Sequence, residues 1–374
     1  MYTPTFRISN NLLKYISRIE ACKEVIDNAP LVPSWEAKFR QEALVRSIHH
    51  GTHLEGNELT KEQTEKIVQI KGDDPEQAAE QAGVFAKERD VQEVLNYRAV
   101  LEWIDAQDLG MSEDKKERGK EIVKHPEYTE DMLRALHSLV VSRVIPDENV
   151  GVYRTKQVVV RSVDSGEVVY RPPLSVDVPQ FIEEFFEWLN SQEAQDIHPV
   201  LRAGIVHYEL VRIHPFIEGN GRTARAMAMF VLYSEGYNVK RFFSLEEYFD
   251  ADIEGYYNAI LSVQKSENQD VTYWLEYFSY GLAVELDRIK QQVLKLSQDI
   301  KLKSKLGKQV ALSERQIILL EILQQKGELT SAEANEALPL ISTDTILRDV
   351  KDLITKGIIR KHGVTKGVRY ILNE

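Results

Sequence analysis

A histidine, a glutamate and two arginines lie close together in one short stretch of the chain, residues 214–225. The imidazole of His214, with an unperturbed pKa of about 6.5, is suited to accept a proton near neutral pH. The carboxylate of Glu218 is a hard oxygen ligand of the kind that binds Mg²⁺ next to phosphates. Arg222 and Arg225 are three residues apart, on one face of a helix, where both guanidinium groups can bind a polyphosphate. These residue types predict a site that holds a magnesium nucleotide and removes a proton next to it.

The segments on both sides of this stretch are apolar at nearly every helical position, which predicts two largely buried helices, 200–213 and 224–233. Pro215 disfavours helical geometry in the residue before it, so the first helix should end there. Gly219-Asn220-Gly221 allows positive φ, which lets successive N–H groups converge on one point. The second helix is expected to begin at about Arg222, with its positive dipole end at the same point. The sequence therefore predicts a phosphate-binding loop between two buried helices.

From residue 214 the stretch reads His-Pro-Phe-Ile-Glu-Gly-Asn-Gly-Arg-Thr-Ala-Arg. It resembles the signature of the Fic family, His-x-Phe-x-Asp/Glu-Gly-Asn-Gly-Arg-x-x-Arg, and matches every fixed position. Members of this family are known for transferring adenosine monophosphate from ATP to a protein hydroxyl. The resemblance implies His214 as general base, Phe216 as a buried anchor, Glu218 as the Mg²⁺ ligand, Gly219, Asn220 and Gly221 as the cradle of the α- and β-phosphates, Arg222 on the β-phosphate and Arg225 on the γ-phosphate.

Two adjacent tyrosines, Tyr256 and Tyr257, lie in a predicted helix after the signature, 249–263. The family resemblance implies that such a pair lies beside the nucleobase, and that Gln264 makes a polar contact with the nucleotide. Aromatic residues at helical spacing are also common in protein cores, so a purely structural role for both tyrosines stays open.

The composition is typical of a globular protein with two or three domains: 374 residues, 43% hydrophobic and 28% charged. The sequence has no run of eighteen apolar residues and no signal-peptide pattern at its start, so we expect no membrane partner. Because Cys22 is the single cysteine, no internal disulfide is expected, which fits a cytoplasmic location. The net charge of −12 should keep the molecule as a whole away from nucleic acid and anionic surfaces.

Helical patterns dominate the chain, and the sequence predicts a mainly α fold. A polar, charged stretch at 110–124 interrupts the pattern, and the helix that ends near residue 306 becomes rich in lysine. We expect four parts: an N-terminal helical region with an inhibitory helix (1–115), a Fic-type catalytic core (116–280), a linker helix (281–309) and a C-terminal winged helix-turn-helix domain (310–374).

A β-hairpin is predicted within the helical core. Gln157–Arg161 is rich in β-branched residues, Asp164-Ser165-Gly166 is a turn signal, and Glu167–Tyr170 is again typical of a strand. The Fic resemblance implies that a hairpin at this position is a flap whose edge, formed by Val158, Val159 and Val160, pairs with an extended target segment. The alternative is a surface hairpin without a function.

Near the N-terminus, Gly51-Thr52-His53-Leu54-Glu55-Gly56-Asn57 ends a predicted helix, 35–56. It resembles the inhibitory motif of the family, Ser/Thr-x-x-x-Glu-Gly/Asn. The resemblance implies that Glu55 pairs with Arg225 and obstructs the γ-phosphate. Gly51 stands where Ser or Thr is expected, although Thr52 follows it. The alternative is an ordinary helix end that stops at a glycine.

The C-terminal segment predicts helices at 314–325, 332–338 and 343–356 and a hairpin formed by 357–360 and 369–372, an order that resembles a winged helix-turn-helix domain. A local excess of basic residues in its third helix and hairpin predicts contact with a DNA backbone. From Ser313 onwards, however, nine acidic residues balance nine basic ones, so contact with a protein stays open. The basic residues are Arg348, Lys351, Lys356, Arg360, Lys361, Lys366 and Arg369.

These patterns together predict a protein adenylyltransferase. A Ser, Thr or Tyr hydroxyl of a target protein attacks the α-phosphate of ATP, with Mg²⁺ as cofactor, and pyrophosphate leaves. One alternative is hydrolytic removal of AMP from a modified protein, with Glu55 aligning the water. Another is a DNA-binding regulator in which the core only senses nucleotide. The sequence leaves the target and the oligomeric state open, a homodimer included.

Replacement of the candidate base tests the chemistry. We expect His214→Ala to lower AMP transfer at least ~10²-fold, the usual contribution of a general base. ATP binding should persist, because the arginines and the loop backbone are unchanged. Transfer is measured with α-labelled ATP and binding by calorimetry. Near-full transfer by the variant would show that His214 is not the base.

Overall fold

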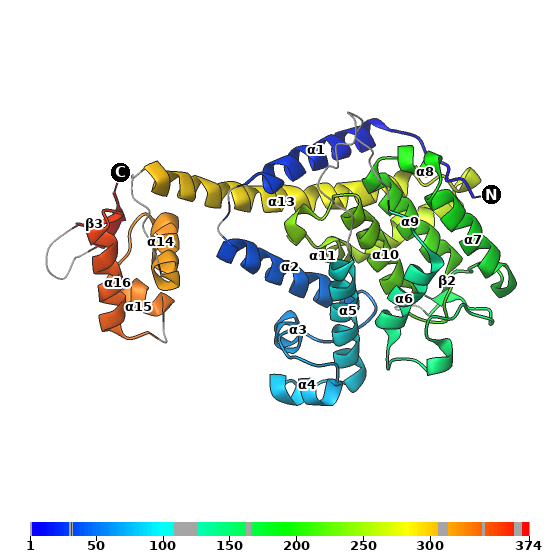
Figure 1. Cartoon of the computed structure of the whole chain (residues 1–374), viewed down its shortest axis with the longest axis horizontal. Helices are drawn as coiled ribbons and strands as arrows, with labels where there is room; N and C mark the ends of the chain where they lie inside the picture. The colour runs from blue at the N-terminus through cyan, green and yellow to red at the C-terminus, as the bar shows by residue number, and fades with distance from the viewer. Residues whose placement is uncertain are drawn as a thin grey trace, which may run out of the picture. The chain divides into compact units, whose positions relative to one another are not determined.

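The structure is a computed structural model in which helices dominate and strands are few and short (Figure 1). Contacts between residues divide the chain into two compact units, Met1–Ser297 and Gln298–Glu374. The finer division of the first unit remains a prediction. Among the described residues, no helix is long and apolar enough to cross a membrane. The structure describes residues 2–29, 31, 33–107, 126–161, 166–305, 313–338, 341–362 and 369–373.

The first unit is built from helices, with one short hairpin. Helix α13, Thr272–Lys305, begins in this unit and continues past its boundary. The other α-helices are α1 (Asn10–Asp27), α2 (Pro33–His53), α3 (Lys61–Val68), α4 (Pro75–Ala82), α5 (Glu88–Ala106), α6 (Glu130–Val141), α7 (Val178–Leu189), α8 (Gln192–Asp196), α9 (Pro199–Ile213), α10 (Asn220–Ser234), α11 (Leu245–Ala251) and α12 (Ile253–Lys265). The strands are β1 (Val160–Arg161) and β2 (Val168–Tyr170), and the 3₁₀ turns are η1 (Asp147–Asn149), η2 (Ser175–Asp177), η3 (Val239–Arg241) and η4 (Glu267–Gln269).

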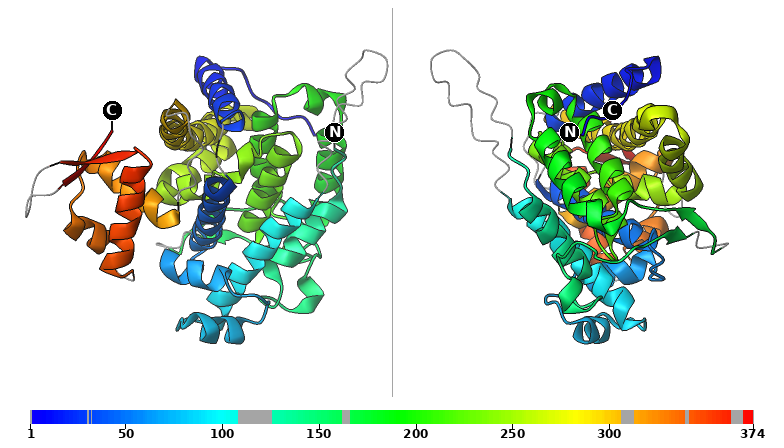
Figure 2. Two further views of the ribbon diagram at one scale, coloured as in Figure 1. Left: turned by 60° about the vertical axis from the view of Figure 1, so that its left-hand side comes forward. Right: turned by 90° about the vertical axis from the view of Figure 1, so that its right-hand side faces the viewer.

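Helices α9 and α10 form the centre of the first unit, as their apolar sequences predict. Almost every residue of both is buried, because other helices cover them on several sides (Figure 2). A hydrogen bond from the indole N–H of Trp274 to the Gly204 carbonyl, 2.7 Å long, joins α13 to α9. This pair of helices fixes the two ends of the predicted phosphate-binding loop.

Helix α2 is held in place by buried polar contacts as well as by apolar packing. The guanidinium of Arg46, 7% exposed, donates to the Phe242 carbonyl at 2.9 Å and lies 3.3 Å from a carboxylate oxygen of Glu285. Ser47 and Tyr97 both donate to the Glu246 carboxylate, at 3.2 and 3.0 Å. A helix with buried partners on α5, α11 and α13 is a fixed support for the residues that follow it.

The predicted hairpin exists, but its first strand is shorter than expected. Strand β1 begins at Val160, which pairs with Tyr170, while Val158 and Val159 precede the strand. Continuing this register would place Val158 opposite Pro172, which has no N–H to donate. The predicted turn residues Asp164 and Ser165 lie outside the described residues.

The second unit contains the predicted helices and hairpin in the predicted order. Strand β3 (Ile359–His362) pairs with β4 (Arg369–Leu372), and Leu329 forms an isolated bridge with Tyr370. The three helices are α14 (Glu314–Lys326), α15 (Ser331–Ala337) and α16 (Thr343–Thr355), which enclose a separate apolar core. Assignment of this unit to the winged helix-turn-helix class stays a prediction.

Candidate active site

The loop between α9 and α10 is built on two residues with positive φ. His214 ends α9 with φ 52°, and Gly219 precedes α10 with φ 77°. The prediction that Asn220 and Gly221 belong to the loop was wrong, because α10 already begins at Asn220. The physical reason is the Asn220 side chain, which accepts from the Phe216 N–H and donates to the Phe216 carbonyl, both at 2.9 Å. These two bonds close the loop before the helix starts.

The ring of His214 makes a hydrogen bond that selects its tautomer. Its Nδ1 lies 3.3 Å from the Val211 carbonyl oxygen. Since a carbonyl can only accept, Nδ1 carries the proton and Nε2 keeps its lone pair. Burial lowers the pKa of His214, although the Val211 carbonyl and the Glu55 carboxylate act in the opposite direction. A neutral imidazole with a free Nε2 is the form that a general base requires.

A second histidine, His137 on α6, packs against the loop. Its ring stacks on Phe216 with the two centroids 3.6 Å apart and the planes 6° from parallel. The Gly151 N–H donates to Nδ1 at 3.0 Å, so Nε2 carries the proton and donates to the Glu218 carbonyl at 3.1 Å. Burial lowers the pKa of His137 to about 4, which keeps the ring neutral. Sequence analysis missed this residue, because a histidine on an apolar helix face carries no specific signal.

Both arginines of the signature are buried and paired with carboxylates from the N-terminal helices. The Arg225 side chain is 3% exposed, and its Nη2 donates to Glu55 Oε1 at 2.8 Å. The Arg222 side chain, also 3% exposed, lies 3.2 Å from Glu93 of α5. Burial acts to raise the pKa of Glu55, but Arg225 and Arg222 outweigh it, so the pKa lies below its ordinary value and the carboxylate is charged. The structure therefore brings Glu55 and Arg225 together, as the motif implied.

The Glu55 carboxylate lies over the first turn of α10. A Cβ atom built on Gly221 would be 2.3 Å from Glu55 Oε1, so the space that a side chain would fill is taken by this oxygen. The N-terminus of a helix is where free N–H groups and the dipole favour an anion. The chain thus supplies its own anion to the place where the sequence predicts a phosphate.

Gly51 contributes a backbone group where the motif has a hydroxyl. Its carbonyl accepts from Arg225 Nη2 at 3.0 Å. A Cβ on Gly51 would be 2.7 Å from the ring of Tyr97, which explains why this helix has no side chain here. The Thr52 hydroxyl faces the carbonyl oxygens of its own helix, Ile48 and His49, at 2.9 and 3.1 Å. The neighbouring threonine therefore does not replace the missing hydroxyl.

Glu218, the candidate Mg²⁺ ligand, contacts the guanidinium of Arg89 at the start of α5. Its side chain is 37% exposed, so the carboxylate is accessible from solvent. Arg89 also donates to Glu93 at 3.3 Å, and Glu93 in turn faces Arg222. Sequence analysis missed Arg89 and Glu93, because a charged helix start is an ordinary pattern.

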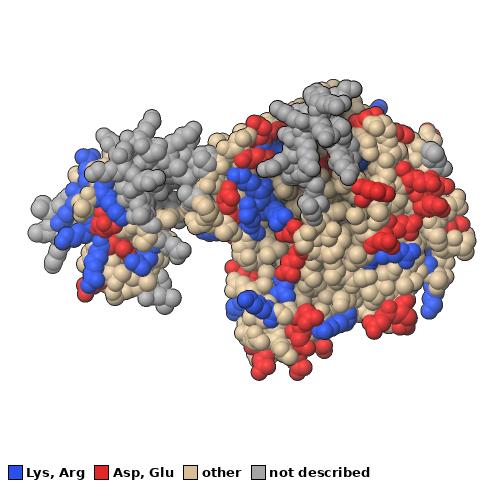
Figure 3. Space-filling model, viewed as in Figure 1, with Lys and Arg blue, Asp and Glu red and all other residues tan. Residues whose placement is uncertain are grey.

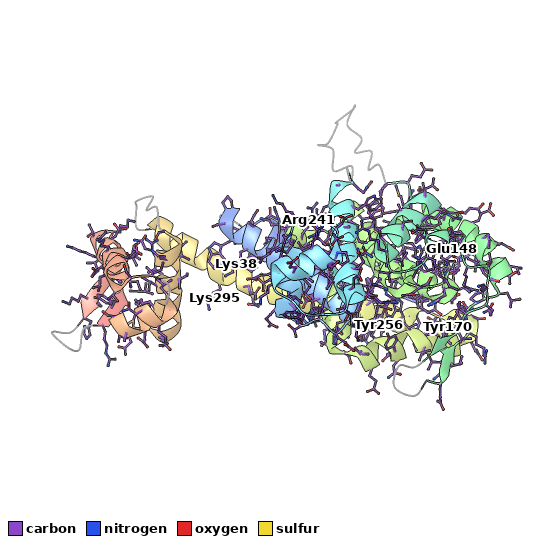
Figure 4. The ribbon with its side chains drawn as sticks, turned by 90° about the horizontal axis from the view of Figure 1, so that it is seen from below. Lys38, Glu148, Tyr170, Arg241, Tyr256 and Lys295 are labelled. Carbon is purple, nitrogen blue, oxygen red and sulfur yellow. The ribbon has the colours of Figure 1, made fainter. Side chains whose placement is uncertain are left out.

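The predicted nucleobase contacts differ in accessibility. Tyr256 is 2% exposed, and its hydroxyl lies 3.0 Å from Nε2 of the buried His207 (Figure 4). Tyr257 is 42% exposed, and Gln264 is half-buried at the end of the same helix, α12. Of the two tyrosines, only Tyr257 is exposed, while Tyr256 is a core residue with a paired hydroxyl.

The low pKa of His137 predicts a pH dependence of stability. In the unfolded chain its pKa is about 6.5, so the unfolded state binds a proton that the folded state refuses between pH 6.5 and 4. The stabilisation that follows is fully present above pH 6.5 and is lost as the pH falls to 4. It amounts to about 3 kcal/mol of the free energy of unfolding. We expect His137→Gln to flatten this part of the profile, measured by urea unfolding with tryptophan fluorescence.

His49 provides the control, because burial also lowers its pKa to about 4. His49→Gln should remove a separate part of the slope, and the double variant should remove both. An unchanged slope in His137→Gln would show that this ring is not kept neutral by the fold.

Residues 127–232, which contain α9, the whole loop and most of α10, match the model of the Fic/DOC family. Relatives named protein adenylyltransferase Fic, from Drosophila grimshawi and Drosophila willistoni, are 32% identical over 201 residues, 54% of this chain. The chain covers 35% and 34% of their lengths, so it spans about a third of these relatives.

Two solved structures share the fold. A Fic family protein from Desulfovibrio desulfuricans superposes with a TM-score of 0.64 at 21% identity, over 100% of this chain and 98% of that one. Fic-1 from C. elegans gives a TM-score of 0.54 at 21% identity, over 77% and 74% of the two chains. The fold is therefore that of these Fic proteins, and residues 127–232 of this chain are similar to the Fic/DOC family.

Proposed function

We propose that this chain is a protein adenylyltransferase that transfers AMP from ATP to a Ser, Thr or Tyr hydroxyl of a target protein. The observation that carries the proposal is the neutral His214, which begins the loop that leads into the N-terminus of α10 and whose proton is on Nδ1, so that Nε2 keeps its lone pair. The naming of the curated relatives supports the same activity. In this reaction the hydroxyl oxygen bonds to the α-phosphorus, His214 Nε2 takes the hydroxyl proton, and pyrophosphate leaves.

The nucleotide would be bound by charge and by backbone N–H groups. Arg222 would bind the β-phosphate and Arg225 the γ-phosphate. Each has a buried Nε with no hydrogen-bond partner among the described residues, so both have unused donors. The first turn of α10, from Asn220, would cradle the α- and β-phosphates, and Tyr257 would face the base.

A magnesium ion fits the accessible carboxylate of Glu218, because Mg²⁺ usually binds through one or two carboxylates and the phosphates of its nucleotide. The ion would neutralise charge on the phosphates and hold them in orientation. Arg89 would have to release Glu218 for the carboxylate to serve as a ligand.

We further propose that Glu55 inhibits the enzyme. Its carboxylate occupies the guanidinium that would bind the γ-phosphate, and adds negative charge where ATP must place its own. A 100-fold reduction of activity requires about 2.7 kcal/mol. An exposed ion pair contributes about 0–1 kcal/mol, whereas a hydrogen bond to a charged group away from solvent contributes about 1.5–3. With Arg225 almost fully buried and Glu55 29% exposed, the pair belongs nearer the stronger class.

Hydrolytic removal of AMP from a modified protein is a second candidate. The position of Glu55 favours this reaction, because a charged carboxylate held close to the loop can orient a water molecule towards a bound phosphoryl group. Transfer requires Glu55 to leave, whereas hydrolysis requires Glu55 to stay. Removing the carboxylate therefore separates the two functions.

We expect Glu55→Gly to raise label incorporation from α-labelled ATP into protein strongly, on the order of 100-fold, because the γ-phosphate site becomes free. γ-labelled ATP should give no incorporation. Glu58→Gly is the matched control, since the ion-pair partner of Glu58 among the described residues is the exposed Lys87. Glu55→Gly combined with His214→Ala should be inactive. Equal transfer by the wild type and Glu55→Gly would show that Glu55 does not restrain the enzyme, and hydrolysis lost in Glu55→Gly would favour the second candidate.

We propose that the C-terminal unit binds DNA through its backbone phosphates. Arg348 and Lys351 on α16 and Arg360 and Lys361 on β3 are exposed, and Lys and Arg side chains are visible on the displayed face of this unit (Figure 3). Two other basic residues of the run are paired internally, Lys356 with Asp352 and Arg369 with Glu328, and Lys366 lies outside the described residues. The available charge is therefore small, which predicts weak binding.

Residues 310–374 should bind duplex DNA weakly, since only a few phosphate contacts are available. The affinity should fall as the salt concentration rises. A gel-shift titration from roughly 20 to 200 mM salt, over which screening of the phosphate charges increases, measures this binding. Arg360→Glu with Lys361→Glu should abolish the shift. Absence of retardation at low salt would leave a protein as the partner of this unit.

A further inference from the structure

Arg154, between η1 and β1, has a buried guanidinium directed at the end of α9. The residue is 4% exposed. Its Nε donates to the carbonyl of His214 at 2.8 Å, and its Nη2 lies 3.3 Å from the carbonyl of Ile213. The last carbonyls of a helix have no partners within the helix, and a cation there also interacts favourably with the dipole. Arg154 therefore stabilises the backbone on which the candidate base is carried.

The same guanidinium also holds the base of the hairpin. Nη2 donates to the Pro173 carbonyl at 2.6 Å and Nη1 to the Lys156 carbonyl at 3.3 Å, one on each side of the β1–β2 segment. The backbone N–H of Arg154 donates to the Pro215 carbonyl at 2.8 Å. Within the part of the chain that the structure describes, no carboxylate lies at ion-pair distance from this arginine, so all its charge is directed at carbonyl groups.

His214 depends on this support because its backbone is in the left-handed region, which is unfavourable for a residue with a side chain. The ring of His214 is itself held by a hydrogen bond from Nδ1 to the Val211 carbonyl. A lysine at position 154 would keep the charge but would lack the planar fork that reaches carbonyls on both sides.

We infer that Arg154 is a positioning residue that couples the hairpin to the base, since one guanidinium binds the carbonyl of His214 and the carbonyls at both ends of the hairpin. The inference rests on the proposed function for the role of the hairpin as the edge that receives a target segment. A target that pairs with the hairpin would act on the same side chain that sets the orientation of His214.

A second link between the hairpin and α9 gives a matched control. The Tyr170 hydroxyl of β2 donates to the Arg212 carbonyl at 2.8 Å, two residues before His214, and no hydrogen bond joins Tyr170 to His214 among the described residues. If only anchoring of the hairpin mattered, loss of this bond and loss of Arg154 would have similar effects. If Arg154 positions His214, only its loss changes the ring.

The experiment compares Arg154→Lys, Arg154→Gln and Tyr170→Phe in the full chain, each with Glu55→Gly to remove the inhibitory pair. We expect Arg154→Lys to lower kcat for incorporation from α-labelled ATP at least about tenfold, with unchanged ATP affinity by calorimetry. Tyr170→Phe should change KM for the protein acceptor more than kcat. Full kcat in Arg154→Lys would overturn the inference.

NMR of the His214 ring gives a readout that does not depend on transfer. Arg154→Lys should shift the ring signals, and Tyr170→Phe should not. Of the charged groups that face His214, Arg154 lowers its pKa and Glu55 raises it, so Arg154→Gln should raise the pKa while Arg154→Lys leaves it nearly unchanged. The lysine variant thereby separates position from charge.

Arg154→Gln keeps a planar amide donor, so it serves if Arg154→Lys does not fold. Equal loss of kcat in Tyr170→Phe, or unchanged ring signals in both Arg154 variants, would show that Arg154 only anchors the hairpin. Absence of transfer in Glu55→Gly alone would contradict the proposed function, and the NMR comparison would still decide the role of Arg154.

Discussion

Two arginine side chains lie almost fully buried on α10, at the centre of the first unit, and a buried guanidinium must have a partner. Taking an unpaired ion out of water costs several kcal/mol, more than a typical single contact returns. The chain meets this constraint with carboxylates from elements distant in sequence: Glu93 of α5 faces Arg222, and Glu55 after α2 faces Arg225. In the proposed function a nucleotide binds these two guanidinium groups. Its phosphates would therefore compete with Glu93 and Glu55 for them.

The two partners differ in how easily they can leave. Glu93 is 6% exposed on a long helix, and it also accepts from the buried amide of Asn57. Glu55 is 29% exposed and lies in the turn after α2 ends at His53, where the chain can move without unwinding the helix. The contacts of Arg46 and Ser47 keep α2 itself fixed. A carboxylate in a turn, next to a helix that other contacts hold in place, can leave Arg225 without loss of the fold.

The loop between α9 and α10 is held by side chains at three places. The Asn220 side chain closes the loop, His137 holds the Glu218 carbonyl from α6, and Arg154 holds the His214 carbonyl. A residue in the left-handed region persists only where its surroundings determine it, and for His214 the Arg154 guanidinium contributes to this. Preorganised geometry of this kind is where phosphoryl-type transfer gains most of its rate.

The sequence by itself determined the parts that depend on local patterns. The apolar periodicity predicted α9 and α10, and the resemblance to the inhibitory motif predicted the pair of Glu55 with Arg225. Tertiary structure decided what local patterns cannot encode. Strand β1 is shorter than predicted because its register would place Val158 opposite Pro172. Helix α10 begins earlier than predicted because the Asn220 side chain bonds to the backbone of Phe216. The partners Glu93, His137 and Arg154 are ordinary residues in sequence, since only the packing of distant helices brings their charges and rings to the loop.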